Sequence, residues 1–188
     1  MGSETKLYTP LAEDEIVKLK IGDKVLLNGK IYSARDAAHK RLVELIKANN
    51  PLPFSIKNQI IYYVGPSPAK PGMAVGSAGP TTSSRMDPYT PILLDNGLKG
   101  MIGKGERKKE VIDSIIKNKA IYFIAIGGAG ALLAQAIKSA KLVAYEDLGA
   151  EAIMEFEVLD FPVIVGIDSL GRDLYTEGIK KYQILEEV

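Results

Sequence analysis

Cysteine is absent from the 188-residue chain, and histidine occurs once, at His39. The lack of cysteine excludes disulfide bonds, a cysteine nucleophile, and any zinc or iron–sulfur site ligated by cysteines of this chain. A single histidine leaves one residue on which a Ser-His-Asp triad could be built, and it excludes a metal site made of several histidines. Any chemistry of this chain therefore uses arginine, lysine, threonine and carboxylates, or depends on a partner.

Excess charge and long apolar runs are also missing. The formal net charge is +1, so bulk electrostatics suggest neither a nucleic acid nor a membrane as a partner. No apolar run reaches the roughly 18 residues needed to span a bilayer, and the N-terminus lacks the apolar stretch of a signal peptide. We therefore expect a cytoplasmic protein. With 46% hydrophobic and 25% charged residues, the chain is expected to form a single domain over residues 1–188.

The order of apolar and turn-forming segments predicts an α/β fold with a mixed sheet and flanking helices. Asn28-Gly29 lies between two apolar runs, which is typical of a β-hairpin with strands at 24–27 and 30–33. Ser33 lies three residues before Asp36, which predicts a capped helix over 34–48. Further strands are expected at 59–64, 98–102, 120–126, 142–145, 152–158 and 162–167, and further helices from after Arg85 to about 96, at 108–118 and at 131–139.

Gly127-Gly-Ala-Gly130 follows an isoleucine-rich strand and precedes an alanine-rich helix. This order is typical of a dinucleotide site, but the spacing does not fit G-x-G-x-x-G and the usual acidic residue is missing. We therefore favour close packing of helix and strand over NAD or FAD binding.

The segment from Gly76 to Tyr89 has the composition of an anion site. Its glycines and Pro80 impose an irregular backbone, and four consecutive hydroxyl residues precede Arg85. A helix N-terminus has unpaired N–H groups and partial positive charge, which attract carboxylates and phosphates. The alternative is that these hydroxyls only cap a helix and solvate a loop.

Two further cations stand at unusual places. Arg35 shares a helix face with His39 near the predicted helix start, where the macrodipole disfavours cations. Lys104 lies between two glycines at a predicted strand-to-helix junction. The alternatives are a solvated arginine, a partly buried structural histidine and a lysine in a surface turn.

Six motifs occur in order over nearly the whole chain: Asn28-Gly-Lys-Ile-Tyr-Ser-Ala-Arg-Asp-Ala-Ala-His39, Ile61-Tyr-Tyr-Val-Gly-Pro66, Gly76-Ser-Ala-Gly-Pro-Thr-Thr-Ser-Ser-Arg-Met-Asp87, Met101-Ile-Gly-Lys-Gly105, Ile126-Gly-Gly128 and Glu146-Asp-Leu-Gly-Ala-Glu-Ala-Ile153. Together they resemble the β-subunit, or C-terminal domain, of class I fumarate hydratases (fumarases) and L-tartrate dehydratases, which are iron–sulfur-dependent hydro-lyases. The third motif is the most specific of the six.

The resemblance implies a swivelling β/β/α domain and a [4Fe-4S] cluster held by three cysteines of another subunit or domain. This chain would be the β-subunit of a two-subunit enzyme that interconverts fumarate and L-malate, with L-tartrate as the alternative substrate. Its partners would be a Cys-containing α-subunit and a small dicarboxylate, in a hetero-oligomer or, when isolated, a homodimer. A different class of function, a stand-alone domain that binds a small anion or a nucleotide without catalysis, stays open.

The resemblance also assigns roles to residues. Arg35, Arg85 and Lys104 match substrate-binding positions, and they would hold the two carboxylates of the substrate. Thr81 matches the position proposed for the base that removes the C3 proton. The local alternatives to Thr81 are Thr82, Ser83 and Ser84.

Asp36 and His39 match family positions as well. We expect them to orient Arg35 and to contribute to the subunit interface, and Thr82 to support the site. No residue of this chain is expected to ligate a metal.

Overall fold

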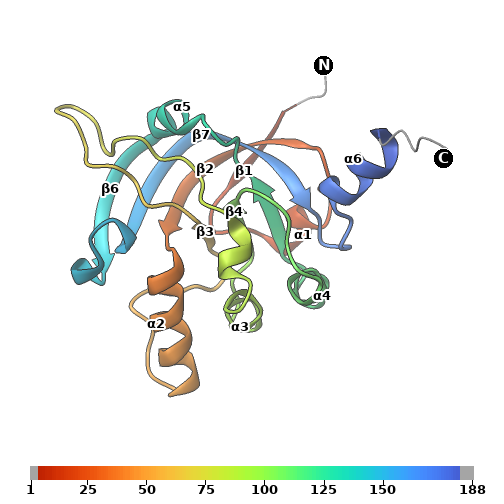
Figure 1. Cartoon of the computed structure of the whole chain (residues 1–188), viewed down its shortest axis with the longest axis horizontal. Helices are drawn as coiled ribbons and strands as arrows, with labels where there is room; N and C mark the ends of the chain where they lie inside the picture. The colour runs from red at the N-terminus through yellow and green to blue at the C-terminus, as the bar shows by residue number, and fades with distance from the viewer. Residues whose placement is uncertain (1–3, 183–188) are drawn as a thin grey trace, which may run out of the picture.

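The computed structural model describes residues 4–182 and is built around a seven-stranded mixed sheet (Figure 1). The strand order is β1-β2-β3-β4-β5-β7-β6, and β2 also pairs with β7. Strands β2, β3, β4, β5 and β7 therefore close into a five-stranded barrel. The bounds are β1 Thr5–Tyr8, β2 Lys24–Ser33, β3 Ile60–Tyr62, β4 Gly100–Gly103, β5 Ile121–Ile124, β6 Ile137–Ala144 and β7 Ile153–Ile167.

Strands β1 to β5 run parallel to their neighbours, whereas β7 runs antiparallel to β2, β5 and β6. The prediction of an α/β fold with a mixed sheet and flanking helices is confirmed. Because β2 to β5 are parallel, the segments that follow them emerge at one edge of the sheet.

Six α-helices and two short 3-10 helices are found within residues 4–182. In Figure 1, α2, α3 and α4 lie on one side of the sheet and α5 lies on the other. None of these helices is long and apolar enough to cross a membrane. Their bounds are α1 Glu13–Ile16, α2 Asp36–Lys47, η1 Ser83–Met86, α3 Thr90–Asp95, α4 Lys109–Asn118, α5 Gly130–Ala136, η2 Glu146–Glu151 and α6 Leu174–Tyr182. Helix α6 was not predicted.

Successive side chains of the barrel strands belong alternately to two apolar clusters. Ile60 and Tyr62 belong to a cluster with members from all five barrel strands, so this cluster fills the barrel. The intervening Ile61 belongs to a second cluster, which includes Leu42 of α2 and Ile115 of α4. The second cluster therefore lies between the outer face of the barrel and the helices.

The predicted hairpin at Asn28-Gly29 is wrong, because β2 continues through both residues and pairs with β7 at Leu27 and again at Gly29. Strand β7 carries one extra residue opposite Asn28, and the Asp160 N–H donates to Asn28 Oδ1 at 2.9 Å. Gly29 has φ +99°, and a Cβ there would lie 2.7 Å from Thr9 Oγ1. Asn28 and Gly29 thus lie opposite a β-bulge of β7, and Gly29 allows Thr9 to pack closely against β2, instead of forming a turn.

Two further boundaries differ from the predictions. The strands expected at 152–158 and 162–167 form one strand, β7, in which Pro162 lies opposite Leu26. The helix expected over 131–139 ends at Ala136, and the next residues begin β6. Residues 137–144 pair with the following strand β7, and β7 pairs with the distant β2, so in both places strand pairing outweighs local propensity.

Candidate functional site

The predicted site residues follow parallel strands at one edge of the sheet. Arg35 lies two residues after the end of β2, and Lys104 comes directly after β4. Thr81 lies beside the end of β3, because its N–H donates to the carbonyl of Tyr63 at 2.8 Å. The carboxyl ends of parallel strands are a common location of ligand sites in α/β proteins.

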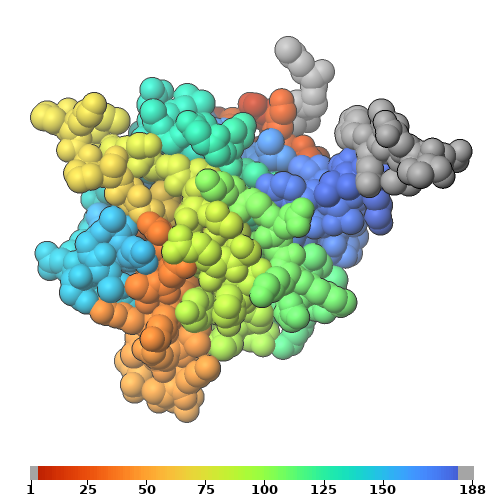
Figure 2. All heavy atoms as spheres, viewed as in Figure 1, coloured from red at the N-terminus to blue at the C-terminus, as the bar shows by residue number. Residues whose placement is uncertain are grey.

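The hydroxyl-rich segment and the Gly103-Lys-Gly105 segment lie side by side. The Ser83 N–H donates to the Lys104 carbonyl at 2.9 Å, and Thr82 forms a parallel bridge with Lys104. A Cβ at Gly103 would overlap Ser83 Oγ, which explains the glycine there. Figure 2 shows this yellow-green part of the chain at the surface, beside the orange part that contains α2.

The two arginines meet at one carboxylate. Arg85 Nε donates to Asp36 Oδ1 at 2.8 Å, and Arg35 Nε lies 3.9 Å from Asp36 Oδ2. Arg35 also approaches Glu151, with 3.5 Å between Nη2 and Oε1. The Arg35 side chain is 22% exposed and that of Arg85 is 50% exposed. Asp36 thus accepts a hydrogen bond from Arg85 and lies within ion-pair distance of Arg35 at the start of α2.

The carboxylate of Glu151 compensates the unfavourable position of Arg35 at the start of α2. Its Oε2 accepts the N–H of Ala37 at 3.1 Å, so a carboxylate from η2 caps α2 and lies beside Arg35. The predicted cap by Ser33 is wrong, since Ser33 ends β2 and its Oγ accepts the N–H of Met154 at 3.0 Å. Gly65 leaves room for Arg35, because a Cβ there would lie 2.8 Å from Arg35 Nη1.

Lys104 and Thr81 keep their functional groups unpaired. Within residues 4–182, the Lys104 ammonium forms no ion pair and the Thr81 hydroxyl forms no hydrogen bond. The N-cap of η1 is Thr82, and it makes no side-chain capping bond. The interpretation of these hydroxyls as helix caps is therefore contradicted by the structure.

The Gly127-Gly-Ala-Gly130 turn packs against this region. The Ala78 N–H donates to the Gly130 carbonyl at 3.0 Å, and a Cβ at Gly130 would lie 2.8 Å from the backbone nitrogen of Gly79. A Cβ at Gly127 would lie 3.6 Å from Lys104 Cδ. The glycines thus permit the close packing that the sequence favoured.

His39 is fully buried beneath Arg35. Its ring Nδ1–H donates to the Arg35 carbonyl at 2.9 Å, and its Nε2 has no hydrogen-bond partner in the described chain. Burial lowers the pKa of His39 from 6.5 to about 4. The imidazole is therefore neutral near pH 7, and it fixes the backbone of Arg35 rather than adding a charge to the site.

Comparison with known proteins identifies the family. A sequence model described as "Fumarase C-terminus" matches residues 2–178. The chain belongs to this family. The resemblance stated from the motifs is thereby confirmed.

Relatives of two lengths are found. A protein of Methanocaldococcus jannaschii, provisionally named L(+)-tartrate dehydratase subunit beta, is 40% identical over 188 residues, which cover 96% of each chain. The anaerobic class I fumarate hydratase of Escherichia coli (strain K12) is 40% identical over 169 residues, 89% of this chain and 31% of the relative. Fumarate hydratase 2 of Leishmania major is 38% identical over 88% of this chain and 29% of the relative. The chain thus spans about a third of the fumarate hydratases.

This member of the Fumarase C-terminus family also contains a buried ion pair that sequence reasoning missed. Arg107 Nε lies 2.7 Å from Asp87 Oδ1, and their side chains are 0% and 2% exposed. The Arg107 guanidinium lies over the rings of Tyr63 and Tyr122, 5.4 and 5.0 Å from their centroids. Asp87 ends the third motif and Arg107 lies two residues after the fourth, but nothing in the sequence distinguishes them from exposed charged residues.

The residues of this chain do not fit an iron–sulfur cluster. The sequence has no cysteine, and residues 4–182 contain no group of three or more His, Asp or Glu side chains that could hold a metal ion. An iron–sulfur cluster ligated by cysteines could therefore be held only by residues outside this chain.

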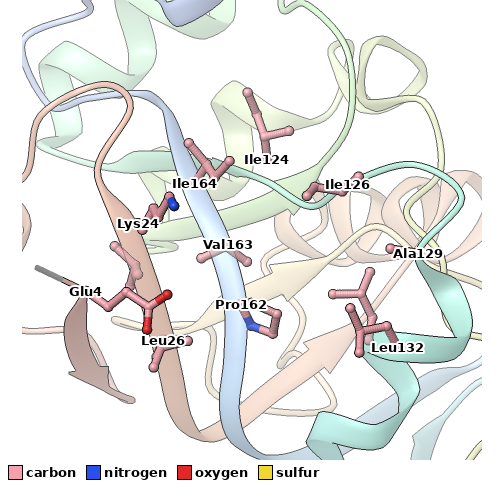
Figure 3. A pocket seen from close by; sticks show the side chains of 12 residues that line it. Glu4, Lys24, Leu26, Ile124, Ile126, Ala129, Leu132, Pro162, Val163 and Ile164 are labelled. Carbon is pink, nitrogen blue, oxygen red and sulfur yellow. The ribbon is translucent and has the colours of Figure 1, made fainter. Parts of the chain in front are cut away.

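Figure 3 shows an apolar hollow of about 150 Å³. Glu4 and Lys24 are the charged residues in its wall, which is otherwise formed by side chains such as Ile126, Leu132 and Val163. None of the predicted site residues lines it. A dianionic ligand would lose its hydration there without enough compensating charge, so this hollow is not the dicarboxylate site.

Proposed function

We propose that this chain is the β-subunit of a two-subunit hydro-lyase that interconverts fumarate and L-malate by reversible hydration. The observation that carries the proposal is the location of Arg35, Arg85, Lys104 and Thr81 at one edge of the sheet in a member of the Fumarase C-terminus family. L-Tartrate is the alternative substrate, since the M. jannaschii relative named for it matches the chain over nearly its whole length.

The cations of this chain would hold the two substrate carboxylates. Arg85 uses Nε for Asp36, which leaves its two terminal nitrogens as a fork for one carboxylate. Lys104 offers a point charge that is not neutralised by an ion pair within residues 4–182. Arg35, whose charge is partly neutralised by Asp36 and Glu151, would also bind a substrate carboxylate.

Thr81 would remove the proton from C3 of malate. A threonine hydroxyl is a weak base, so its alkoxide needs nearby positive charge to exist, and the same cations would stabilise the negative charge that develops on the substrate carboxylate. The unpaired state of the Thr81 hydroxyl supports this role. Thr82, whose hydroxyl is also unpaired, is the supporting residue and the local alternative.

The remaining part of the enzyme would come from a Cys-containing α-subunit. We propose that it holds the [4Fe-4S] cluster, because this chain lacks the ligands for one. Residues 1–188 would form a single swivelling β/β/α domain, in a cytoplasmic hetero-oligomer or, when isolated, a homodimer. Asp36 and His39 would orient Arg35 in this assembly.

Reconstitution with the partner tests the proposal. The chain is co-expressed with a Cys-containing candidate α-subunit, purified anaerobically and assayed on malate, fumarate and both tartrates, with each subunit alone as a control. We expect malate and fumarate turnover by the complex only. Faster turnover of L-tartrate would favour the alternative substrate, and a cluster-loaded complex without turnover of any of these acids would favour the non-catalytic anion-binding domain.

A further inference from the structure

Two segments carry the proposed substrate cations, and a buried ion pair joins them. Asp87 lies two residues after Arg85, and Arg107 lies three residues after Lys104. Arg107 Nε donates to Asp87 Oδ1 at 2.7 Å, and Asp87 Oδ2 accepts the N–H of Lys108 at 3.0 Å. Both oxygens of Asp87 are therefore occupied by the segment that follows Lys104.

A second buried connection runs through Tyr122 of β5. The Tyr122 hydroxyl donates to the Gly105 carbonyl at 2.9 Å and lies 2.9 Å from Ser83 Oγ. Because a phenol has one hydrogen, Ser83 Oγ donates to Tyr122. Together with the bond from Ser83 N–H to the Lys104 carbonyl, this fixes the segment that carries Arg85 against the segment that carries Lys104.

The pair is enclosed on all sides. The Arg107 guanidinium lies over Tyr63 and Tyr122, and its Nη2 donates to Thr90 Oγ1 at 2.9 Å. A fully bonded buried network specifies one geometry, whereas an apolar group of equal size often gives equal or greater stability. The pair is therefore better suited to fixing a position than to increasing stability.

We infer that Asp87, Arg107, Ser83 and Tyr122 are positioning residues that set the spacing between Arg85 and Lys104. This inference rests on the proposed function for its effect on substrate. Without the network, the two cations would remain present but their separation would vary, so each dicarboxylate would bind more weakly.

Two variants separate positioning from simple stabilisation. Tyr122→Phe removes the link from Ser83 to Gly105 and keeps the ring beside Arg107. The double variant Asp87→Leu with Arg107→Met replaces the ion pair by apolar side chains of similar size. The matched control is Asp95→Leu with Lys117→Met, which removes an exposed ion pair of 2.9 Å on α3 and α4.

The first measurement is amide hydrogen exchange of the chain alone. In both variants we expect the Ser83 N–H to exchange at least 10-fold faster, while the Ile115 N–H in α4 reports unchanged global stability. The control pair should leave the Ser83 rate unchanged. Because no substrate or partner is needed, this measurement stays informative if the proposed function fails.

The second measurement is the kinetics of the reconstituted enzyme. We expect KM for malate to rise at least 10-fold in both variants, with kcat changed less than 3-fold, because the cations and Thr81 are retained. Normal Ser83 exchange and normal KM in both variants would overturn the inference. If the double variant does not fold, Tyr122→Phe decides alone, and an inactive wild-type complex would count against the proposed function and leave the exchange result standing.

Discussion

At the scale of single residues, the two arginines of the proposed site differ in what they can offer a substrate. Arg35 is close to two carboxylates, Asp36 and Glu151, whereas Arg85 is bonded to Asp36 through Nε alone. The more exposed Arg85 thus presents a free fork, and Arg35 presents a guanidinium whose charge is partly balanced. Arg85 should therefore contribute more to carboxylate binding than Arg35.

Replacing Arg85 by lysine should impair the enzyme nearly as much as replacing it by alanine. Lysine keeps the charge but loses both the forked contact and the bond from Nε to Asp36. A charge-assisted hydrogen bond contributes about 1.5–3 kcal/mol, so KM for malate should rise about 10- to 100-fold. Steady-state kinetics of the reconstituted complex measure this, and a near-normal KM for Arg85→Lys would show that the fork is not used.

Thr81→Ala should lower kcat at least ~100-fold and leave KM nearly unchanged, as expected when a general base is lost. The melting temperature should stay constant, because the Thr81 hydroxyl makes no hydrogen bond within residues 4–182. Malate turnover and deuterium exchange at C3 are measured, with Thr82→Ala as the matched control. Near-normal deuterium exchange in Thr81→Ala, together with a loss of exchange in Thr82→Ala, would identify Thr82 as the general base.

His39 should make stability depend on pH in a defined window. Unfolded histidine binds a proton near pH 6.5, whereas burial holds the pKa of folded His39 at about 4. Between these two pH values the unfolded chain therefore binds more protons than the folded chain. The contribution of neutral His39 to the free energy of unfolding is fully present above pH 6.5, and it is lost as the pH falls towards 4. The loss is about 3 kcal/mol from this group. The free energy of unfolding, measured with urea between pH 7 and pH 4, should fall more with decreasing pH in wild type than in His39→Gln. The same pH dependence in both proteins would contradict the prediction.

At the scale of elements, local signals predicted the helices better than the barrel. Helices α2 and α4 follow from apolar side chains at helical spacing, which is a property of neighbouring residues. The continuity of β2 and β7 depends on their pairing with each other about 130 residues apart, which no local pattern contains. Arg35 is proposed as a site cation because it lies near a predicted helix start, Lys104 because it lies at a predicted strand-to-helix junction, and Arg85 because it follows four hydroxyl residues. The burial of Asp87 and Arg107 could not be predicted, because the sequence does not show which charges the fold encloses.

Gly29→Ala should destabilise β2 through both strain and contact. Gly29 has φ +99°, and the new Cβ would lie 2.7 Å from Thr9 Oγ1 and 3.2 Å from the Thr9 carbonyl oxygen. We expect a loss of more than about 1 kcal/mol in the free energy of unfolding. The matched control is Gly72→Ala, where φ is +81° but a Cβ would meet nothing within 4 Å. Equal losses in both variants would mean that the contact with Thr9 is unimportant.

At the scale of the whole molecule, the chain has only some of the features that its proposed reaction requires. It offers cations and a hydroxyl at one edge of the sheet, and Lys104 and Thr81 leave their functional groups unpaired within residues 4–182. Because this edge of the sheet has unneutralised positive charge and unpaired hydroxyls, it is suited to bind a dianion beneath a partner protein. The longer fumarate hydratases, of which the chain spans about a third, contain additional sequence that could provide such a cover.

The isolated chain should therefore be colourless, free of iron and inactive on malate, even after anaerobic treatment with iron and sulfide. The physical reason is that cluster ligation requires thiolates, and the sequence contains none. The measurement is the visible absorption spectrum and iron content of the treated chain, followed by a malate assay before and after addition of the cluster-loaded partner. A variant of the partner with its cluster cysteines replaced is the control, and it should not restore activity. A stable cluster spectrum together with malate turnover in the chain alone would contradict the two-subunit proposal, because catalysis would then need no second protein.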